Sequence, residues 1–180
     1  MNPNMKKLTY SALFLALAFV LPFFTGQIPQ IGSMLSPMHL PVMLCGFVCG
    51  GPWGLAVGFV APVLRSLLFG MPPLFPTALA MAFELAAYGL FCGVFYQVFG
   101  KTMSALKATY VSLILAMLAG RLVWGAAQFI LLGLSGGSFT FAAFLAGAFT
   151  NAVPAIVVQL ILVPAISVLL GRTMKAPSCA

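Results

Sequence analysis

The segment 76–98, PTALAMAFELAAYGLFCGVFYQV, is mainly apolar and contains one charged residue, Glu84. A helix needs about 20 mainly apolar residues to cross the hydrocarbon core of a bilayer, so this segment is long enough to span a membrane. An ionisable side chain within such a span requires a partner or a wet cavity. The segment therefore predicts a membrane helix with one carboxylate that must be satisfied inside the protein.

The remainder of the chain has the same composition. Of its 180 residues, 63% are hydrophobic and 5% are charged, whereas a soluble domain has about 25% charged residues. The gaps between the apolar runs are too short for a folded insertion. We therefore expect an all-α integral membrane protein with six transmembrane helices, in which residues 1–180 form one domain. The predicted spans are residues 8–24, 37–50, 54–69, 76–98, 108–132 and 139–170.

The basic residues that flank the predicted spans all fall on one side of the membrane. With six helices and a cytoplasmic N-terminus, the positive-inside rule is satisfied without exception. We therefore expect a multi-pass protein of the cell membrane with both termini in the cytoplasm. The flanking basic residues are Lys6, Lys7, Lys101, Lys107, Arg172 and Lys175.

The acidic content argues against an enzyme. Glu84 is the only acidic residue, so paired carboxylates and carboxylate-bound magnesium are ruled out, and we predict no cofactor. Cys45 and Cys49 share a helical face at i and i+4, which permits a redox or metal role but fits small buried thiols better. The net charge of +7 comes from residues beside apolar spans. It suits anchoring at an anionic inner leaflet, so nucleic acid is not an expected partner.

Two arginines, Arg65 and Arg121, also lie within predicted spans. Each intramembrane charge costs about 2.5 to 3.5 kcal/mol on insertion scales. Glu84 and Arg121 could pair to hold two helices together, or they could face a ligand, and the sequence leaves both alternatives open. Arg65 lies near the end of its span, where its side chain can snorkel. If both arginines point inward, one glutamate leaves a net charge of +1, which the carboxylate of a ligand would balance.

Polar side chains on the same helical faces extend this candidate site. Tyr88 follows Glu84 at i+4 and therefore lies on the same face of its helix. Trp124 and Gln128 follow Arg121 at i+3 and i+7, which puts an indole N–H, an amide and a cation on one stripe. These residues are candidates for contact with a polar ligand.

Two further polar residues lie in the second and last predicted spans. His39 lies at the start of the second span, where a lone histidine is more commonly an interfacial hydrogen-bonding group than a ligand contact. Asn151 falls within the last span and needs hydrogen-bond partners, which a polar pocket or a neighbouring helix would supply. Pro154 in the same span removes a backbone hydrogen bond and favours a kinked helix beside a pocket.

Several features together resemble a known family. They are the segments 36–76, SPMHLPVMLCGFVCGGPWGLAVGFVAPVLRSLLFGMPPLFP, and 82–90, AFELAAYGL, and a pair of small residues, Ala12 and Ala16, on one face of the first helix. With six short helices and both termini inside, the chain resembles the substrate-binding S components of energy-coupling factor (ECF) vitamin transporters. The resemblance covers nearly the whole chain.

The resemblance implies a membrane-embedded protein that captures a small-molecule vitamin from outside the cell. The partner would be an ECF module made of one transmembrane T component and two ATPase subunits. Ala12 and Ala16 would form the docking surface for this module. Residues 25–36 and 70–75 would close over the bound ligand.

The resemblance also implies that the fourth to sixth helices supply most ligand contacts, among them Glu84, Arg121 and Asn151. It does not fix the vitamin, because members for different vitamins share the scaffold. The possible positive imbalance in the interior favours an anionic vitamin such as pantothenate or niacin.

Two alternatives belong to other classes of function. A secondary transporter driven by protons through Glu84 would accumulate its solute without ATPases. An integral-membrane redox enzyme would depend on Cys45 and Cys49, whereas a binding protein would keep its affinity when either cysteine is replaced by serine.

Overall fold

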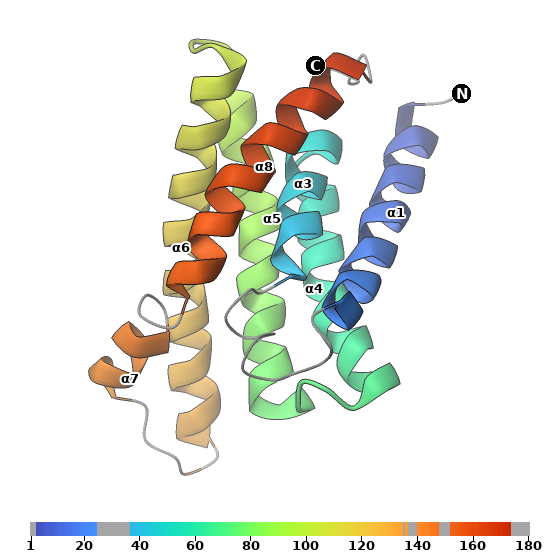
Figure 1. The fold of residues 1–180 in the computed structure, drawn as a ribbon. Helices are drawn as coiled ribbons and strands as arrows, with labels where there is room; N and C mark the ends of the chain where they lie inside the picture. The colour runs from blue at the N-terminus through green and yellow to red at the C-terminus, as the bar shows by residue number, and fades with distance from the viewer. Residues whose placement is uncertain (1–2, 25–36, 135, 137–139, 148–151, 174–180) are drawn as a thin grey trace.

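The computed structural model describes residues 3–24, 37–134, 136, 140–147 and 152–173, and every regular element in these residues is helical (Figure 1). This confirms the predicted all-α class. The elements are α1 Pro3–Phe24, α3 His39–Cys49, α4 Gly51–Phe69, the π-helical turn η1 Leu74–Ala78, α5 Leu79–Phe99, α6 Ala105–Leu134, α7 Phe141–Leu145 and α8 Val153–Thr173.

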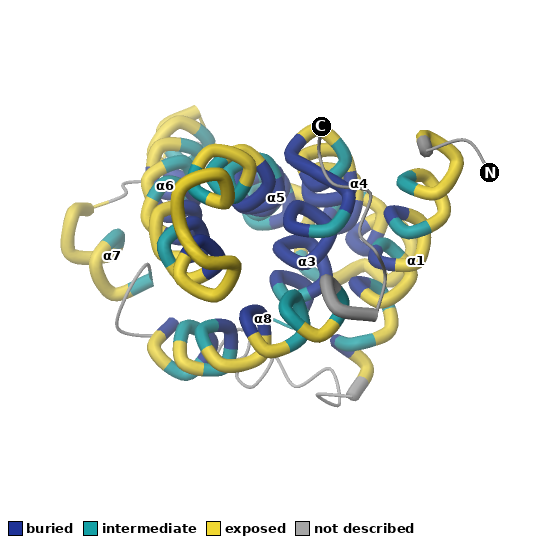
Figure 2. The backbone as a smooth tube through the Cα atoms, turned by 90° about the horizontal axis from the view of Figure 1, so that it is seen from above, coloured by how far each residue is buried: buried dark blue, intermediate teal, exposed yellow. Residues whose placement is uncertain are grey.

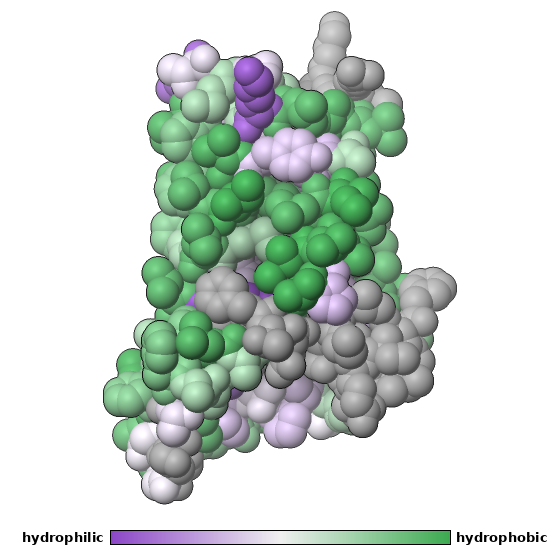
Figure 3. All heavy atoms as spheres, turned by 60° about the vertical axis from the view of Figure 1, so that its left-hand side comes forward, coloured by the Kyte–Doolittle hydropathy of each residue, from purple (hydrophilic) through white to green (hydrophobic). Residues whose placement is uncertain are grey.

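The helices run up and down through one bundle. The start of α1, the turn between α5 and α6, and the end of α8 all lie at the upper end of Figure 1. Lys6 and Lys7 in α1 therefore lie at the same end as Lys101 and Lys107 around the α5–α6 turn. A broad hydrophobic band covers the face shown in Figure 3, with hydrophilic residues gathered at this upper end. The arrangement suits a bundle surrounded by lipid tails, with its lysines at one membrane surface.

Five helices are long and apolar enough to cross a membrane. They correspond to α1, α4, α5 with its preceding turn, α6 and α8. The second predicted span, residues 37–50, corresponds to α3, which has 11 residues and therefore extends only about 16 Å, roughly half the hydrocarbon thickness. A count of six complete spans is therefore not confirmed.

The last predicted span, residues 139–170, is wrong as a single helix. The chain forms the short helix α7, which ends at Leu145, and then α8, which begins at Val153. Pro154 consequently lies in the first turn of α8 rather than inside a long helix. A proline in the first turn loses no helical hydrogen bond, because the first N–H groups of a helix have no partner within it. The expected kink at Pro154 is thus a helix start.

The centre of the bundle is formed by α3 and α5. Seen from above, α3 lies among α1, α4, α5 and α8, and its backbone is almost entirely buried (Figure 2). Only Leu40 and Val48 of α3 are not buried. The surrounding helices each have one buried face and one exposed apolar face. Because lipid solvates the exposed apolar faces, the interior can hold the polar groups of the chain.

Backbone contacts at glycines bring α3, α4 and α5 together. A Cβ atom added to Gly89 of α5 would collide with the backbone of Gly54 in α4, and one added to Gly46 of α3 would collide with the carbonyl of Gly89. Near the upper end, a Cβ on Gly93 would collide with the backbone of Gly51. Three helices therefore approach one another as closely as their backbones allow.

The sequence contains a signal for this contact that hydropathy alone does not use. Gly54 and Gly58 in α4, and Gly89 and Gly93 in α5, are both spaced as Gly-x-x-x-Gly. This spacing puts two glycines on one face and permits close approach of membrane helices. The pair Ala12 and Ala16 in α1 has the same spacing, but both residues are exposed.

Replacing Gly89 with alanine is expected to destabilise the bundle. Overpacking typically costs about 1 to 3 kcal/mol, and the cost at Gly89 should reach the top of that range because the obstructing atoms belong to backbone that cannot rotate away. Gly133→Ala is the control, since nothing lies within 4 Å of a Cβ added there. Thermal unfolding in detergent should show a lower midpoint for Gly89→Ala only. Equal midpoints for Gly89→Ala and the wild type would contradict the close-contact interpretation.

Candidate functional site

The interior of the bundle contains an ion pair between α5 and α6. Glu84 is 2% exposed and Arg121 is 8% exposed, and Arg121 Nη1 lies 2.9 Å from Glu84 Oε1. The Tyr88 hydroxyl donates a hydrogen bond of 3.0 Å to the same oxygen. Glu84 and Arg121 therefore pair, which is one of the two alternatives that the sequence left open, and the i+4 relation brings Tyr88 to the carboxylate as expected.

His39 reaches this ion pair from the first residue of α3. Its Nε2 atom lies 3.8 Å from Glu84 Oε1, and its ring centroid lies 5.4 Å from that of Tyr88. The side chain is buried at 3% exposure, which the interfacial interpretation of His39 did not anticipate. His39, Glu84, Tyr88 and Arg121 thus form one cluster from three helices, which we call the Glu84 cluster.

Glycine also explains how Tyr88 fits beside α6. A Cβ atom added to Gly120 would collide with the aromatic ring of Tyr88. The ring therefore lies directly on the backbone of α6, one residue before Arg121. The hydroxyl of Tyr88 and the guanidinium of Arg121 both contact Oε1 of Glu84 beside this contact.

Several buried polar atoms in the interior of the bundle have no hydrogen-bond partner in the described part of the chain. Leaving such an atom unsatisfied costs about 1 to 3 kcal/mol. They come from α3, α6 and α8, and those of His39 and Arg121 belong to the Glu84 cluster. The atoms are His39 Nδ1 and Nε2, Ser112 Oγ, Arg121 Nε, Gln128 Oε1 and Gln159 Nε2.

Gln159 was missed in the sequence. It is 1% exposed and lies on the buried face of α8 with Ala155 and Val163. Because α8 packs against α3 and α6, this amide faces the side of the bundle that holds His39 and Arg121. A lone glutamine within a strongly apolar span was the available signal, since a buried amide needs partners.

Trp124 and Gln128 share a helix with Arg121 but have different surroundings. Gln128 is buried. Trp124 is half-buried and stacks on Phe144, with ring centroids 6.3 Å apart and an angle of 27° between the planes. A Cβ atom added to Gly147 would collide with the Trp124 ring. The indole therefore packs against the segment around α7.

Arg65 is buried on another side of the bundle. Its Nη1 atom donates a hydrogen bond of 3.4 Å to the carbonyl of Phe19 in α1. Its guanidinium lies 5.5 Å and 5.7 Å from the ring centroids of Phe23 and Phe69. Cation–π contact and the carbonyl stabilise the charge there, so Arg65 does not contribute its charge to the Glu84 cluster. The expected net charge of +1 from two arginines facing one interior site is therefore wrong, because Glu84 matches the single arginine of the cluster.

Two predicted parts of the site lie outside the described residues. They are Asn151 and the segment 25–36. The other predicted lid, residues 70–75, joins α4 to η1 at the lower end of Figure 1, and most of its residues are exposed.

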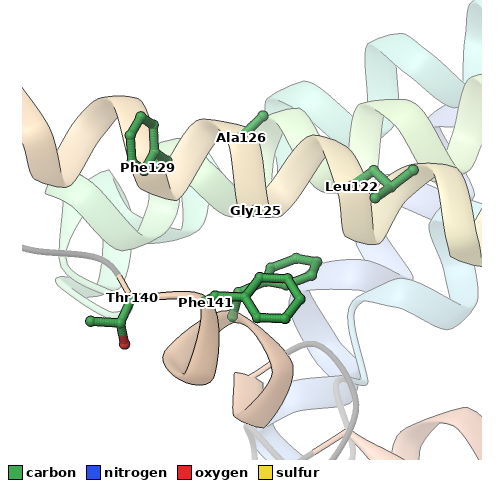
Figure 4. A pocket seen from close by; sticks show the side chains of 7 residues that line it. Leu122, Gly125, Ala126, Phe129, Thr140 and Phe141 are labelled. Atoms are coloured by element: carbon green, nitrogen blue, oxygen red, sulfur yellow. The ribbon is translucent and has the colours of Figure 1, made fainter.

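A separate groove of about 390 Å³ lies between α6 and α7 (Figure 4). Apart from Thr140 its lining is apolar, and it includes no residue of the Glu84 cluster. A water-soluble ligand needs polar contacts as well as apolar walls. The Glu84 cluster is therefore the better candidate for the ligand site. The groove residues are Leu122, Gly125, Ala126, Phe129, Thr140, Phe141 and Phe144.

The cysteines are packed inside the bundle. Cys45, Cys49 and Cys92 are buried free thiols, and Cys45 Sγ donates a hydrogen bond of 3.6 Å to Ser11 Oγ of α1. Among the described residues, no three His, Cys, Asp or Glu side chains gather closely enough to hold a metal ion. These contacts fit a packing role for the thiols.

Five apolar helices of spanning length around a buried ion pair define a polytopic membrane protein with a polar interior. The family model described as "ECF transporter, substrate-specific component" matches residues 6–167. The chain therefore belongs to the family of substrate-specific components of ECF transporters. No curated protein and no solved structure matches the chain.

Membership in this family bears on the alternatives considered for the sequence. Proteins of this family are components of transporters, and the family is not one of enzymes. It places the chain in a membrane, with a small-molecule substrate and an ECF module as partner. The redox role considered for Cys45 and Cys49 has no support from this family.

Breaking the ion pair from one side should destabilise the protein more than replacing both partners. Glu84→Gln leaves the Arg121 charge buried without its carboxylate, and Arg121→Met does the reverse; each should cost about 3 to 5 kcal/mol. The double variant removes both charges and should recover most of this loss. Thermal midpoints of the purified variants in detergent provide the measurement. A double variant less stable than both single variants would contradict this account.

Proposed function

We propose that this protein is the membrane-embedded binding subunit of an ECF importer for a small, water-soluble, anionic vitamin such as pantothenate or niacin. It binds the vitamin from outside, with both termini in the cytoplasm, and passes it to a T component driven by two ATPase subunits. The observation that supports this proposal best is the Glu84 cluster, a buried ion pair with unpartnered polar atoms around it.

The buried polar atoms distinguish a ligand site from a purely structural ion pair. A pair that only joins two helices needs no further hydrogen-bonding groups, yet Arg121 Nε and both nitrogens of His39 make no hydrogen bond in the described residues. A ligand with polar groups would satisfy them and remove the cost of leaving them unpaired. Arg121 can use one edge of its guanidinium for Glu84 and another for the ligand.

The remaining predicted contacts complete this proposal. Gln128 extends the buried face of α6, and we include Trp124 and Asn151 among the proposed contacts. Arg65 contributes through the packing of α1 against α4. The segments 25–36 and 70–75 close over the bound vitamin and separate it from water.

The substrate class is tested by mass spectrometry of small molecules that remain bound through purification in mild detergent. A tight binder retains its ligand, so we expect a vitamin with a carboxylate. A co-purified solute that is neutral or cationic would contradict the anionic class while leaving the binding function in place.

Arg121→Lys should weaken the binding of the anionic vitamin. Lysine keeps the charge but loses the planar fork, and a hydrogen bond to a charged group is worth about 1.5 to 3 kcal/mol, or tenfold or more in affinity. Calorimetric titration with nicotinate and pantothenate measures the effect. Lys107→Gln is the control, because Lys107 is exposed and lies near the start of α6.

The double variant Glu84→Gln with Arg121→Met decides between recognition and structure. A folded double variant should lose binding if Arg121 contacts the vitamin. Retained affinity would leave Arg121 as a structural partner of Glu84 and end its proposed role in recognition.

The proposed docking surface lies on the exposed side of α1. Ala12 and Ala16 are exposed, whereas Ser11, Phe14 and Ala18 on the opposite side are buried in the bundle. The alanine pair therefore does not pack against the described parts of this chain. Two small side chains on an exposed membrane helix allow close approach of another helix, which supports docking of the T component.

Replacing Ala12 and Ala16 with leucine should block uptake in cells and leave vitamin binding by the purified protein unchanged. The larger side chains would separate the two helix backbones but would not disturb the bundle. Ala165→Leu, an exposed alanine of α8, is the matched control and should permit uptake. Loss of purified binding together with uptake would assign the pair to internal packing instead.

The same cells separate the ECF mechanism from proton-coupled transport. Uptake by an S component requires the ATPase subunits. Uptake that continues without them and stops when the proton gradient is dissipated would favour a secondary transporter that uses Glu84.

A further inference from the structure

The only histidine of the chain and its only acidic residue lie beside each other in the interior of the bundle. His39 Nε2 is 3.8 Å from Glu84 Oε1, and the two residues are 3% and 2% exposed. This distance is too long for a hydrogen bond, but it is an ion-pair distance when the histidine is protonated. The interaction between the two side chains therefore depends on whether His39 carries a proton.

The carboxylate of Glu84 is already balanced by one cation. Arg121 Nη1 lies 2.9 Å from Glu84 Oε1, and the Tyr88 hydroxyl donates to the same oxygen over 3.0 Å. Tyrosine is ordinarily uncharged near neutral pH. With a neutral His39 the charges of the cluster sum to zero, so a substrate anion bound here adds one negative charge that the cluster does not balance.

Among the described residues, no further cation is placed to balance such an anion. Arg65 of α4 is held by α1 and two aromatic rings. Residues Val153–Leu170 of α8 include no titratable side chain, and neither do the segments 25–36 and 148–151. The other titratable residues of the helices that pack on α3 lie nearer its upper end. They are Lys6, Lys7 and Tyr10 in α1, Cys45 and Cys49 in α3 itself, and Cys92 and Tyr96 in α5.

A proton on His39 would restore the balance of charge. An unpaired buried charge is so costly that sites of this kind normally neutralise by gaining or losing a proton. Histidine is the side chain whose charge ordinarily changes near neutral pH. Both nitrogens of an imidazolium are donors, and neither nitrogen of His39 makes a hydrogen bond in the described part of the chain. One N–H is then available to Glu84 and the other to the ligand.

We propose that the protein takes up one proton, on His39, each time it binds its anionic substrate. The inference rests on the proposed binding of an anionic vitamin and adds the proton as a second component of that binding. The proton comes from the solvent and stays on the imidazole until the vitamin leaves, and no covalent bond to the vitamin forms. The step needs no proton gradient, which distinguishes it from transport driven by protons through Glu84.

Calorimetric titration in buffers with different enthalpies of ionisation counts the protons. At about pH 8, where histidine is ordinarily neutral, wild-type protein should take up about one proton for each nicotinate or pantothenate bound. The uncharged analogues nicotinamide and pantothenol should bind without proton uptake, because they bring no charge that needs balancing.

The affinity for the two acids should also depend on pH. Each bound anion requires a proton, so affinity should fall by up to about tenfold for each pH unit above the range in which histidine titrates. Affinity for the neutral analogues should stay constant over the same range. The dependence on pH thus belongs to the charge of the ligand and not to general unfolding of the protein.

His39→Gln keeps a polar side chain but cannot gain a proton. In the folded variant, proton uptake and the dependence of acid binding on pH should both disappear. Lys107→Gln, at an exposed position near the start of α6, is the control and should retain an uptake of about one proton. Circular dichroism and gel filtration in detergent establish that each variant is folded.

A spectroscopic measurement identifies the protonated group without any substitution. Because His39 is the only histidine, tag-free protein grown with isotope-labelled histidine gives the signals of a single imidazole in nuclear magnetic resonance spectra. The nitrogen shifts should change from those of a neutral ring to those of an imidazolium when nicotinate or pantothenate is added at about pH 8. Nicotinamide and pantothenol should leave the ring neutral.

The outcomes separate this inference from the proposed function. Binding of either acid without proton uptake, or with a ring that stays neutral, would overturn the inference while the protein remains a vitamin binder. Proton uptake that persists in folded His39→Gln would assign the proton to Glu84 and overturn the role of His39. Failure of the wild type to bind either acid or its neutral analogue would instead overturn the proposed vitamin class, and the inference with it.

Discussion

Contact between the backbones of α3, α4 and α5 determines where every other part of the interior lies. At Gly89 a side chain of any size is excluded, because the backbone of Gly54 occupies its place. Gly89 lies five residues after Glu84 in α5, so the contact fixes the part of α5 next to the carboxylate. The same contact positions α3, whose first residue, His39, lies beside Glu84. A polar cluster in a membrane tolerates little displacement, since each lost hydrogen bond leaves a buried atom unsatisfied. The charged groups can therefore hold their positions only if the glycines keep the helices in close contact.

The charges in turn divide the bundle into two functional sides. One side holds the Glu84 cluster between α3, α5 and α6, with Gln159 of α8 facing the same region. The other side holds Arg65 between α1 and α4, where a carbonyl and two aromatic rings satisfy it. The exposed alanines of α1 face away from both. The proposed solute site and the proposed partner contact therefore lie on different surfaces of one small protein.

Hydropathy predicted the helical class and most helix positions because the bilayer imposes a length and a polarity on each span. The i+4 spacing of Glu84 and Tyr88, and the need of a buried arginine for a counter-charge, correctly brought three members of the cluster together. His39 was harder to place, since its burial depends on α3 being too short to reach the lower surface. Arg65 required knowledge of α1, because its partner is a backbone carbonyl that no sequence pattern displays. Hydropathy did not predict the break between α7 and α8, because it considers only the apolar character of the residues.

The unequal lengths of the helices affect how the protein fits its membrane. With 30 residues, α6 is about 45 Å long, whereas α1 with 22 residues is about 33 Å long. A bilayer of uniform thickness cannot match both sides of such a bundle, so α6 must tilt or the surrounding lipid must thicken beside it. The position of the bundle in the membrane is consequently sensitive to lipid chain length. A thicker bilayer would accommodate α6 with less tilt, but it would have to become thinner around the shorter helix α1.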